Sequence, residues 1–115
     1  MKIYDCFMYL DEDVVLDLRL NYLDDYVDRF VIVESQFTHS GQKRILNFDI
    51  NKFKKFKDKI IYLILNHEPK DIQTIHKNDD LNTQNSKYIL NGMRRDFYQR
   101  NFISNGLTKA NDNDL

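Results

Sequence analysis

Residues whose types could do chemistry gather at the end of an apolar run in the first third of the chain. Phe30–Val33 is continuously apolar and ends on a carboxylate, Glu34, and the polar string Thr38–Gly41 follows shortly after. A continuous apolar run predicts a strand buried on both faces, as in a parallel sheet. Ligands of open α/β sheets bind just beyond the carboxyl ends of such strands. Glu34 and its loop therefore lie where a binding site is expected.

Two carboxylates are candidates for contact with a ligand. Glu34 either accepts hydrogen bonds from the base or ribose of a nucleotide, or caps backbone amides of the loop that follows it. We expect Glu12, which follows the first apolar segment, to face the same crevice, because neighbouring parallel strands end at the same edge. Helix capping is the alternative for this acidic cluster and the better explanation of Asp11.

Thr38 and His39 are candidates for binding a sugar. A hydroxyl and an imidazole can hold sugar hydroxyls, and Gly41 lets the backbone approach a phosphate closely. The alternative is an ordinary turn with an exposed histidine. No catalytic triad can be assembled from these residues, and we expect His67 and His76 to lie on the surface.

Arg100 and Asn101 lie near the end of the last predicted helix. The planar fork of donors on arginine suits a diphosphate. An ion pair with Asp96, four residues earlier, is the alternative for Arg100. The chain contains no glycine-rich phosphate-binding fingerprint.

Alternating strands and helices would position these residues. The predicted strands are Lys2–Leu10, Arg29–Glu34 and Ile60–Leu65. A helix beginning at Asp11–Asp13 has its apolar side chains spaced by three and four residues, at Leu16, Leu20, Leu23 and Val27. A short helix capped by Asp49 turns three apolar side chains inward, those of Ile50, Phe53 and Phe56. The strand–helix alternation predicts an α/β fold with a right-handed, doubly wound parallel sheet.

The last third of the chain is expected to be a polar connection followed by a long helix. Asn66–Gln84 is predicted to be mobile, and Ser86 to cap a helix that runs to about Asn105. Its apolar face comprises Ile89, Met93, Phe97, Ile103 and Leu107. Gly106 suits the left-handed position that ends a helix.

Composition places the chain among small globular domains. It has 115 residues, of which 42% are hydrophobic, and 17 basic residues nearly balance 18 acidic ones. That balance gives no general attraction to nucleic acid. The single cysteine, Cys6, is expected in a reduced core. Asp5 within the first apolar run argues against a signal peptide, and no apolar run could span a bilayer. We therefore expect a cytoplasmic chain.

The chain stops where a fourth strand would begin. One apolar residue, Leu115, follows the polar turn after the last helix, so we expect residues 1–115 to be the N-terminal portion of a domain truncated at this point. The alternative is a natural small protein that covers the open sheet edge by forming a homodimer.

Several of these segments resemble the N-terminal part of glycosyltransferase family 17, the family of β-1,4-mannosyl-glycoprotein 4-β-N-acetylglucosaminyltransferases. The resemblance rests on Ile3–Phe7, Glu12, Arg19–Asn21 and above all Val31–Gly41. It implies a three-layer Rossmann-like parallel sheet, the N-terminal half of a GT-A-type fold. The implied enzyme binds a UDP-sugar, UDP-N-acetylglucosamine in the first place, and transfers the sugar to a glycan acceptor.

The resemblance also implies roles for individual residues. Glu12 and Glu34 would contact the nucleotide, and Arg100 with Asn101 would lie near the donor. The acidic metal-binding motif of the family, which would hold Mn²⁺ or Mg²⁺, is expected beyond Leu115 in a full-length enzyme, as are the acceptor half and the catalytic base. We interpret Asp112 and Asp114 as turn residues. The chain alone is therefore expected to contain no catalytic residue and to be inactive.

Two other functions compete with this interpretation. One is a non-catalytic small α/β module that binds a nucleotide or a protein. The other, a phosphate-accepting receiver domain, is disfavoured because the third strand ends at Leu65-Asn66, without an aspartate to accept phosphate.

Overall fold

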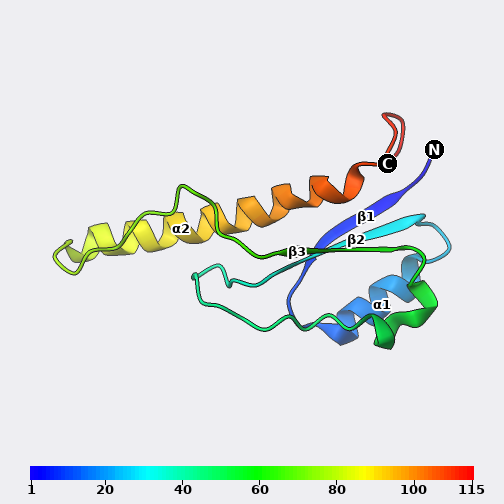
Figure 1. Ribbon diagram of the computed structural model, residues 1–115, viewed down its shortest axis with the longest axis horizontal. Coiled ribbons are helices and arrows are strands. Elements are labelled where there is room, and N and C mark those ends of the chain that lie inside the picture. Colours follow the sequence, from blue (N-terminus) through cyan, green and yellow to red (C-terminus); the bar gives the residue numbers. More distant parts are fainter.

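Three parallel strands form the centre of the structure, a computed structural model that describes residues 1–115 (Figure 1). Strand β2 (Arg29–Ser35) lies between β1 (Tyr4–Tyr9) and β3 (Ile60–Leu65). Tyr4 pairs with Arg29 at the start of the sheet, and Tyr9 pairs with Glu34 at its end. The three predicted strands and the α/β class are therefore confirmed.

One face of the sheet is covered by α1 (Asp13–Leu23) and the 3₁₀ helix η1 (Ile50–Phe56). The predicted cap of η1 is present, since the Asp49 carboxylate accepts from the Asn51 amide at 2.9 Å. The predicted inward-facing residues, except Ile50, which is only half-buried, lie in or against the core on this face together with residues of β1 and β2. Its buried members are Tyr9, Leu16, Leu20, Val27, Phe30, Ile32, Phe53 and Phe56.

The opposite face is covered by the end of α2 (Leu81–Phe102) and by η2 (Ile103–Leu107). Gly106 lies so close to the sheet that a Cβ atom there would be 2.5 Å from Cγ1 of Val31. Only Gly41 has a positive φ, so the left-handed conformation predicted for Gly106 is wrong. The chain continues as a 3₁₀ turn there, and close packing on β2 requires the glycine.

Helix α2 begins six residues earlier than the sequence predicts. The Asp80 carboxylate caps it by accepting from the Thr83 amide at 2.7 Å, and Ser86 lies inside the helix. Both residue types cap helices well, and the sequence alone did not rank them.

The segment between β3 and α2 runs back along α2 as a strap, residues 66–80 (Figure 1). Polar contacts join the two. Asn91 exchanges hydrogen bonds with the backbone of Gln73 at 2.8 and 2.9 Å, and Lys87 pairs with Asp79 at 2.7 Å. The first half of α2 and the strap therefore form an arm that projects beyond the sheet.

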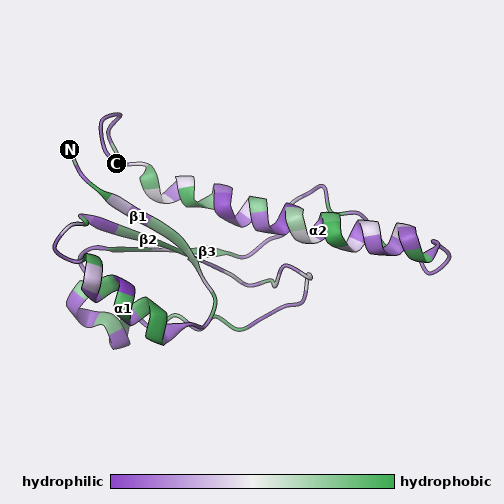
Figure 2. Ribbon diagram, turned by 180° about the vertical axis from the view of Figure 1, so that it is seen from behind, coloured by the Kyte–Doolittle hydropathy of each residue, from purple (hydrophilic) through white to green (hydrophobic).

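The predicted apolar face of α2 is open to solvent along the arm. The side chains of Ile89, Met93 and Phe97 are 60%, 47% and 55% exposed. The buried residues of this helix are polar, namely Asn91 and Gln99. Figure 2 shows the resulting mixture of hydrophilic and hydrophobic residues along α2, in contrast to the largely hydrophobic strands.

After α2 the chain returns to the free edge of β1. The Leu115 amide donates to the Lys2 carbonyl at 2.8 Å, and the Tyr4 amide donates to the Leu115 carbonyl at 2.6 Å. This is the bonding pattern of a parallel pair. The chain thus advances from β1 towards β3 and then returns to the other side of β1. None of the helices has both the length and the apolar character needed to cross a membrane.

Candidate functional site

A cavity of about 310 Å³ lies at the carboxyl ends of β1 and β2. This volume falls at the lower end of the range typical of small-molecule sites. Open α/β sheets bind ligands beyond the carboxyl ends of their parallel strands, and the cavity lies in such a position. Its wall consists of residues from both strand ends, the loop after β2 and helix α2, namely Met8, Tyr9, Leu10, Glu12, Ser35, Phe37, Thr38, His39, Arg44 and Gln99.

Three of the predicted site residues, Glu12, Thr38 and His39, line this cavity. Glu12 precedes α1, and its carboxylate accepts from the Asp11 amide at 2.8 Å. The Thr38 hydroxyl accepts from the Gln42 amide at 3.1 Å and so closes the turn that contains Gly41. The structure thus brings these residues together, although Thr38 also has the turn role that was its alternative.

His39 connects the cavity wall to α2. Its Nε2 atom lies 3.2 Å from Oε1 of Gln99 and 3.7 Å from Oδ1 of Asp96. The His39 carbonyl accepts from the Arg95 guanidinium at 3.1 Å. Gly41 packs so tightly on that guanidinium that a Cβ atom would lie 2.5 Å from it. Helix α2 therefore fixes the position of the loop after β2.

Glu34 lies beneath the cavity and has 0% exposure. One carboxylate oxygen accepts from the Asn47 amide at 2.7 Å and from Arg44 at 2.9 Å. The other accepts from the Phe48 amide at 3.0 Å and from the Tyr62 hydroxyl at 2.7 Å. These bonds match the second interpretation of Glu34, in which it caps amides of the following loop.

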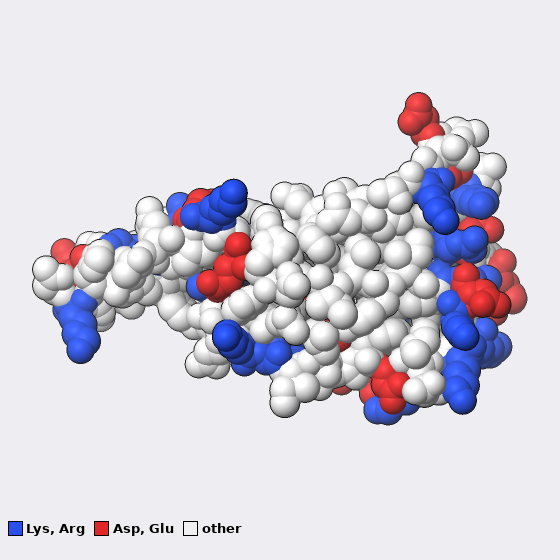
Figure 3. All heavy atoms as spheres, in the orientation of Figure 1, with Lys and Arg blue, Asp and Glu red and all other residues white.

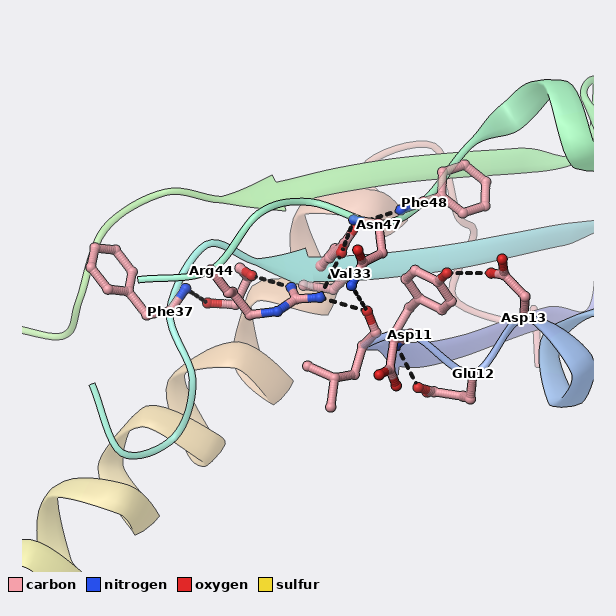
Figure 4. A network of polar contacts seen from close by, with 12 residues as sticks. Asp11, Glu12, Asp13, Val33, Phe37, Arg44, Asn47 and Phe48 are labelled. Atoms are coloured by element: carbon pink, nitrogen blue, oxygen red, sulfur yellow. Dashed lines mark hydrogen bonds and ion pairs between the residues drawn. The ribbon is translucent and has the colours of Figure 1, made fainter. Parts of the chain in front are cut away.

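Arg44 is a site residue that sequence reasoning missed. Its side chain is only 10% exposed. Besides its bond to Glu34, it donates to the carbonyls of Leu10 and Ser35, each at 2.5 Å. Figure 4 shows Arg44, Asn47 and Phe48 meeting in this network. The only signal in the sequence was an arginine ten residues after a strand-end acid.

Arg100 and Asn101 lie outside the cavity. Arg100 pairs with Asp96 at 3.2 Å, the ion pair considered as its alternative, and its side chain is 60% exposed. Asn101 is also exposed. Because successive residues of a helix are about 100° apart, Gln99 faces the sheet while its two successors point away from it. The structure does not bring these two residues together with the other candidates.

The apolar wall of the cavity is held by a tyrosine–aspartate contact. The Tyr9 hydroxyl donates to Oδ1 of Asp13. This bond lowers the pKa of Asp13. Burial is the main cause that raises the pKa of Tyr9, and the bond to Asp13 raises it further. Tyr9 therefore stays neutral and Asp13 charged at neutral pH. Cys6, expected in the core, is only partly buried, and desolvation raises the pKa of its thiol.

The residues of this chain do not form a divalent metal site. No three His, Cys, Asp or Glu side chains converge as metal ligands. Asp112 lies in a turn, and the Asp114 carboxylate accepts from the Lys2 and Asn111 amides at 2.8 Å. Both positions agree with their interpretation as turn residues, and we assign no residue here to a metal.

Comparison with known proteins identifies related sequences. The model of the family described as glycosyltransferase family 17 matches residues 1–100. The human protein named beta-1,4-mannosyl-glycoprotein 4-beta-N-acetylglucosaminyltransferase is 39% identical over 59 residues, which cover 48% of this chain and 11% of that protein. The rat protein of the same name gives the same values, and the mouse protein is 37% identical over the same length. No solved structure gives a significant match.

Proposed function

The chain belongs to glycosyltransferase family 17, and we propose on this basis that it forms the nucleotide-sugar-binding portion of a glycosyltransferase. The donor would be a UDP-sugar, UDP-N-acetylglucosamine above all, and the sugar would pass to a glycan acceptor. The fold would be the N-terminal half of a Rossmann-like GT-A domain. The match spans about a tenth of the curated relatives, so catalysis is proposed for a longer protein rather than for these 115 residues.

The position of the cavity is the observation that carries this proposal. It lies at the carboxyl ends of β1 and β2 and combines an acid, a hydroxyl and an imidazole on its wall. Oxygen and nitrogen atoms of this kind bind ribose hydroxyls and base edges. Glu12, Thr38 and His39 are the proposed contacts with the donor. A divalent cation, when bound, would neutralise the leaving diphosphate.

Titration of this chain with UDP tests the proposal. We expect ¹⁵N-detected amide shifts of Thr38, His39 and residues 10–12 to change in a saturable manner, with a smaller effect from CDP at equal concentration. Thr38→Val should weaken binding, and Thr83→Val, on the far end of α2, serves as its matched control. Shifts that are equal for both nucleotides and scattered over the surface would contradict the assignment of the site.

A second candidate function, a protein-binding module, is favoured by the open apolar surfaces. Ile89, Met93 and Phe97 form an unpartnered stripe on α2, and β3 has one unpaired edge. Figure 3 shows that the middle of the face over β3 is almost free of charged side chains. Under this reading the chain would form a monodisperse dimer in sedimentation velocity, and Phe97→Glu would return it to a monomer.

A further inference from the structure

We propose that Arg44 contacts the ligand in the cavity and that Glu34 is a positioning residue that acts on the ligand only through Arg44. This inference rests on the proposed function for the identity of the ligand, a uridine nucleotide. It changes the expected role of Glu34 from direct contact to support, and it assigns a binding role to an arginine that the sequence did not single out.

The bonds of Glu34 exclude a direct role. A carboxylate has acceptor positions for about four donors. In the structure two backbone amides, a guanidinium and a tyrosine hydroxyl fill them. The side chain is also inaccessible to solvent. A ligand would have to displace one of these donors before it could reach Glu34.

The bonds of Arg44 leave two of its five N–H groups without an acceptor. A guanidinium has five N–H groups, and Arg44 contacts three acceptors, the Glu34 carboxylate and the carbonyls of Leu10 and Ser35. Arg44 also lines the cavity. Its remaining N–H groups are therefore available to a carbonyl or phosphate oxygen of a bound nucleotide.

The same contacts connect all three strands. Arg44 bonds to Leu10, just after β1, and to Ser35, the last residue of β2. Glu34 accepts hydrogen bonds from Tyr62 of β3 and from the amides of Asn47 and Phe48 in the loop. Loss of the carboxylate charge would leave the guanidinium without its anion and let it turn away from the cavity.

Two substitutions and one control test the two parts of the inference. Arg44→Lys keeps the charge but cannot reach two carbonyls and a carboxylate with one ammonium group. Glu34→Gln keeps the shape and removes the charge. Arg19→Lys is the control, because Arg19 also pairs closely with a carboxylate, that of Asp5 at 2.6 Å, and does not line the cavity. Each variant is assayed for UDP affinity, thermal stability and amide hydrogen exchange.

We expect Arg44→Lys to weaken UDP binding about tenfold and Glu34→Gln about threefold, as loss of charged hydrogen bonds predicts. The double variant should bind no more weakly than Arg44→Lys alone, because Glu34 acts through Arg44. Exchange of the Asn47 and Phe48 amides should quicken in Glu34→Gln. Arg19→Lys should lower stability without changing the affinity for UDP.

Four results would overturn the inference or one of its two parts. If both variants lose stability but keep the affinity of the original chain, the pair is only structural. If the two losses of affinity add in the double variant, Glu34 acts independently of Arg44. Absence of UDP binding by the original chain would instead reject the proposed function and the contact by Arg44 together. Unchanged exchange of the Asn47 and Phe48 amides would separately reject the positioning by Glu34.

Discussion

The two faces of β2 are covered in opposite ways. On one face, α1 and η1 bury aromatic and aliphatic side chains around Phe30 and Ile32. On the other side, the buried residues of α2 are polar. Gln99 contacts Val33 of β2, and Asn91 contacts the strap beyond the sheet. The side chains of Ile89, Met93 and Phe97 are left in solvent. Helix α2 contacts β1 and β2, and η2 packs on β2 and β3 through Gly106.

The difference shows which part of the molecule holds the fold and which part is attached to it. Apolar burial contributes about 25 cal/mol per Å², whereas each hydrogen bond of the arm contributes only about 1 kcal/mol net. Segments with few buried apolar contacts open first in native proteins. The arm should therefore open at a lower free energy than the sheet, and substitutions in the two regions should differ accordingly.

Truncation of the core should have the largest effect. Phe30→Ala removes a side chain with 0% exposure, and we expect a loss of about 3–5 kcal/mol in the free energy of unfolding measured with urea. Met93→Ala on the exposed stripe should change it by less than about 0.5 kcal/mol. Similar losses at both positions would mean that α2 is as well packed as the core.

Removal of the buried carboxylate should come next. Glu34→Ala leaves Arg44 buried without its anion, so we expect a loss of about 3 kcal/mol in the free energy of unfolding. UDP binding should weaken by about 1 kcal/mol, no more than the loss expected for Arg44→Lys. Calorimetric titration measures the affinity, and Asp49→Ala, which removes only an exposed cap, is a suitable control. An unchanged affinity would show that the network beneath the cavity is irrelevant to binding.

A polar substitution in the arm should act locally and more weakly. Asn91→Ala removes both bonds to the backbone of Gln73 and should cost about 1–2 kcal/mol. Hydrogen exchange of the Gln73 amide should quicken while amides of β2 keep their rates. Asn82→Ala, on the exposed side of the same helix, is the control. Faster exchange throughout the sheet would instead show that the arm and the sheet unfold together.

The smallest expected effect is on the loss of stability at acid pH. Hydrogen bonds from Thr83 lower the pKa of Asp80 below its ordinary value. The folded state therefore holds the charged form more strongly than the unfolded state does. This stability is fully present above about pH 4 and is lost as the pH falls through the lower folded value. Asp80→Asn should flatten the decline of the melting temperature between pH 5 and pH 2. An unchanged slope would exclude Asp80 as a contributor.

Local patterns in the sequence predicted most of the sheet and its first covering layer. The strand Ile60–Leu65 and the inward positions of Phe53 and Phe56 are as expected. These elements have an apolar run or regular spacing that burial alone explains. The start of α2 was missed because two residues that can cap a helix, Asp80 and Ser86, stand six residues apart. The apolar stripe of α2 stays exposed to solvent because the strap packs against another side of the helix.

The site was only partly predictable for a similar reason. Glu12, Thr38 and His39 follow strand ends, and strand ends fix the location of a cavity. Arg44 was missed because its contacts with Leu10 and Glu34 form only when the loop folds back across the strand ends. No local pattern distinguishes an arginine in such a loop from an exposed one.

The contact between Gly106 and Val31 sets how closely the end of α2 and the following η2 can approach the sheet. The helix end cannot come closer to the sheet at this contact, and a larger residue at position 106 would push the helix end away from the sheet. Gln99 lies about 10 Å back along the helix and is the residue of α2 that lines the cavity. The distance between Gln99 and the opposite wall of the cavity therefore depends on Gly106, which does not line the cavity. Even Gly106→Ala would increase that distance.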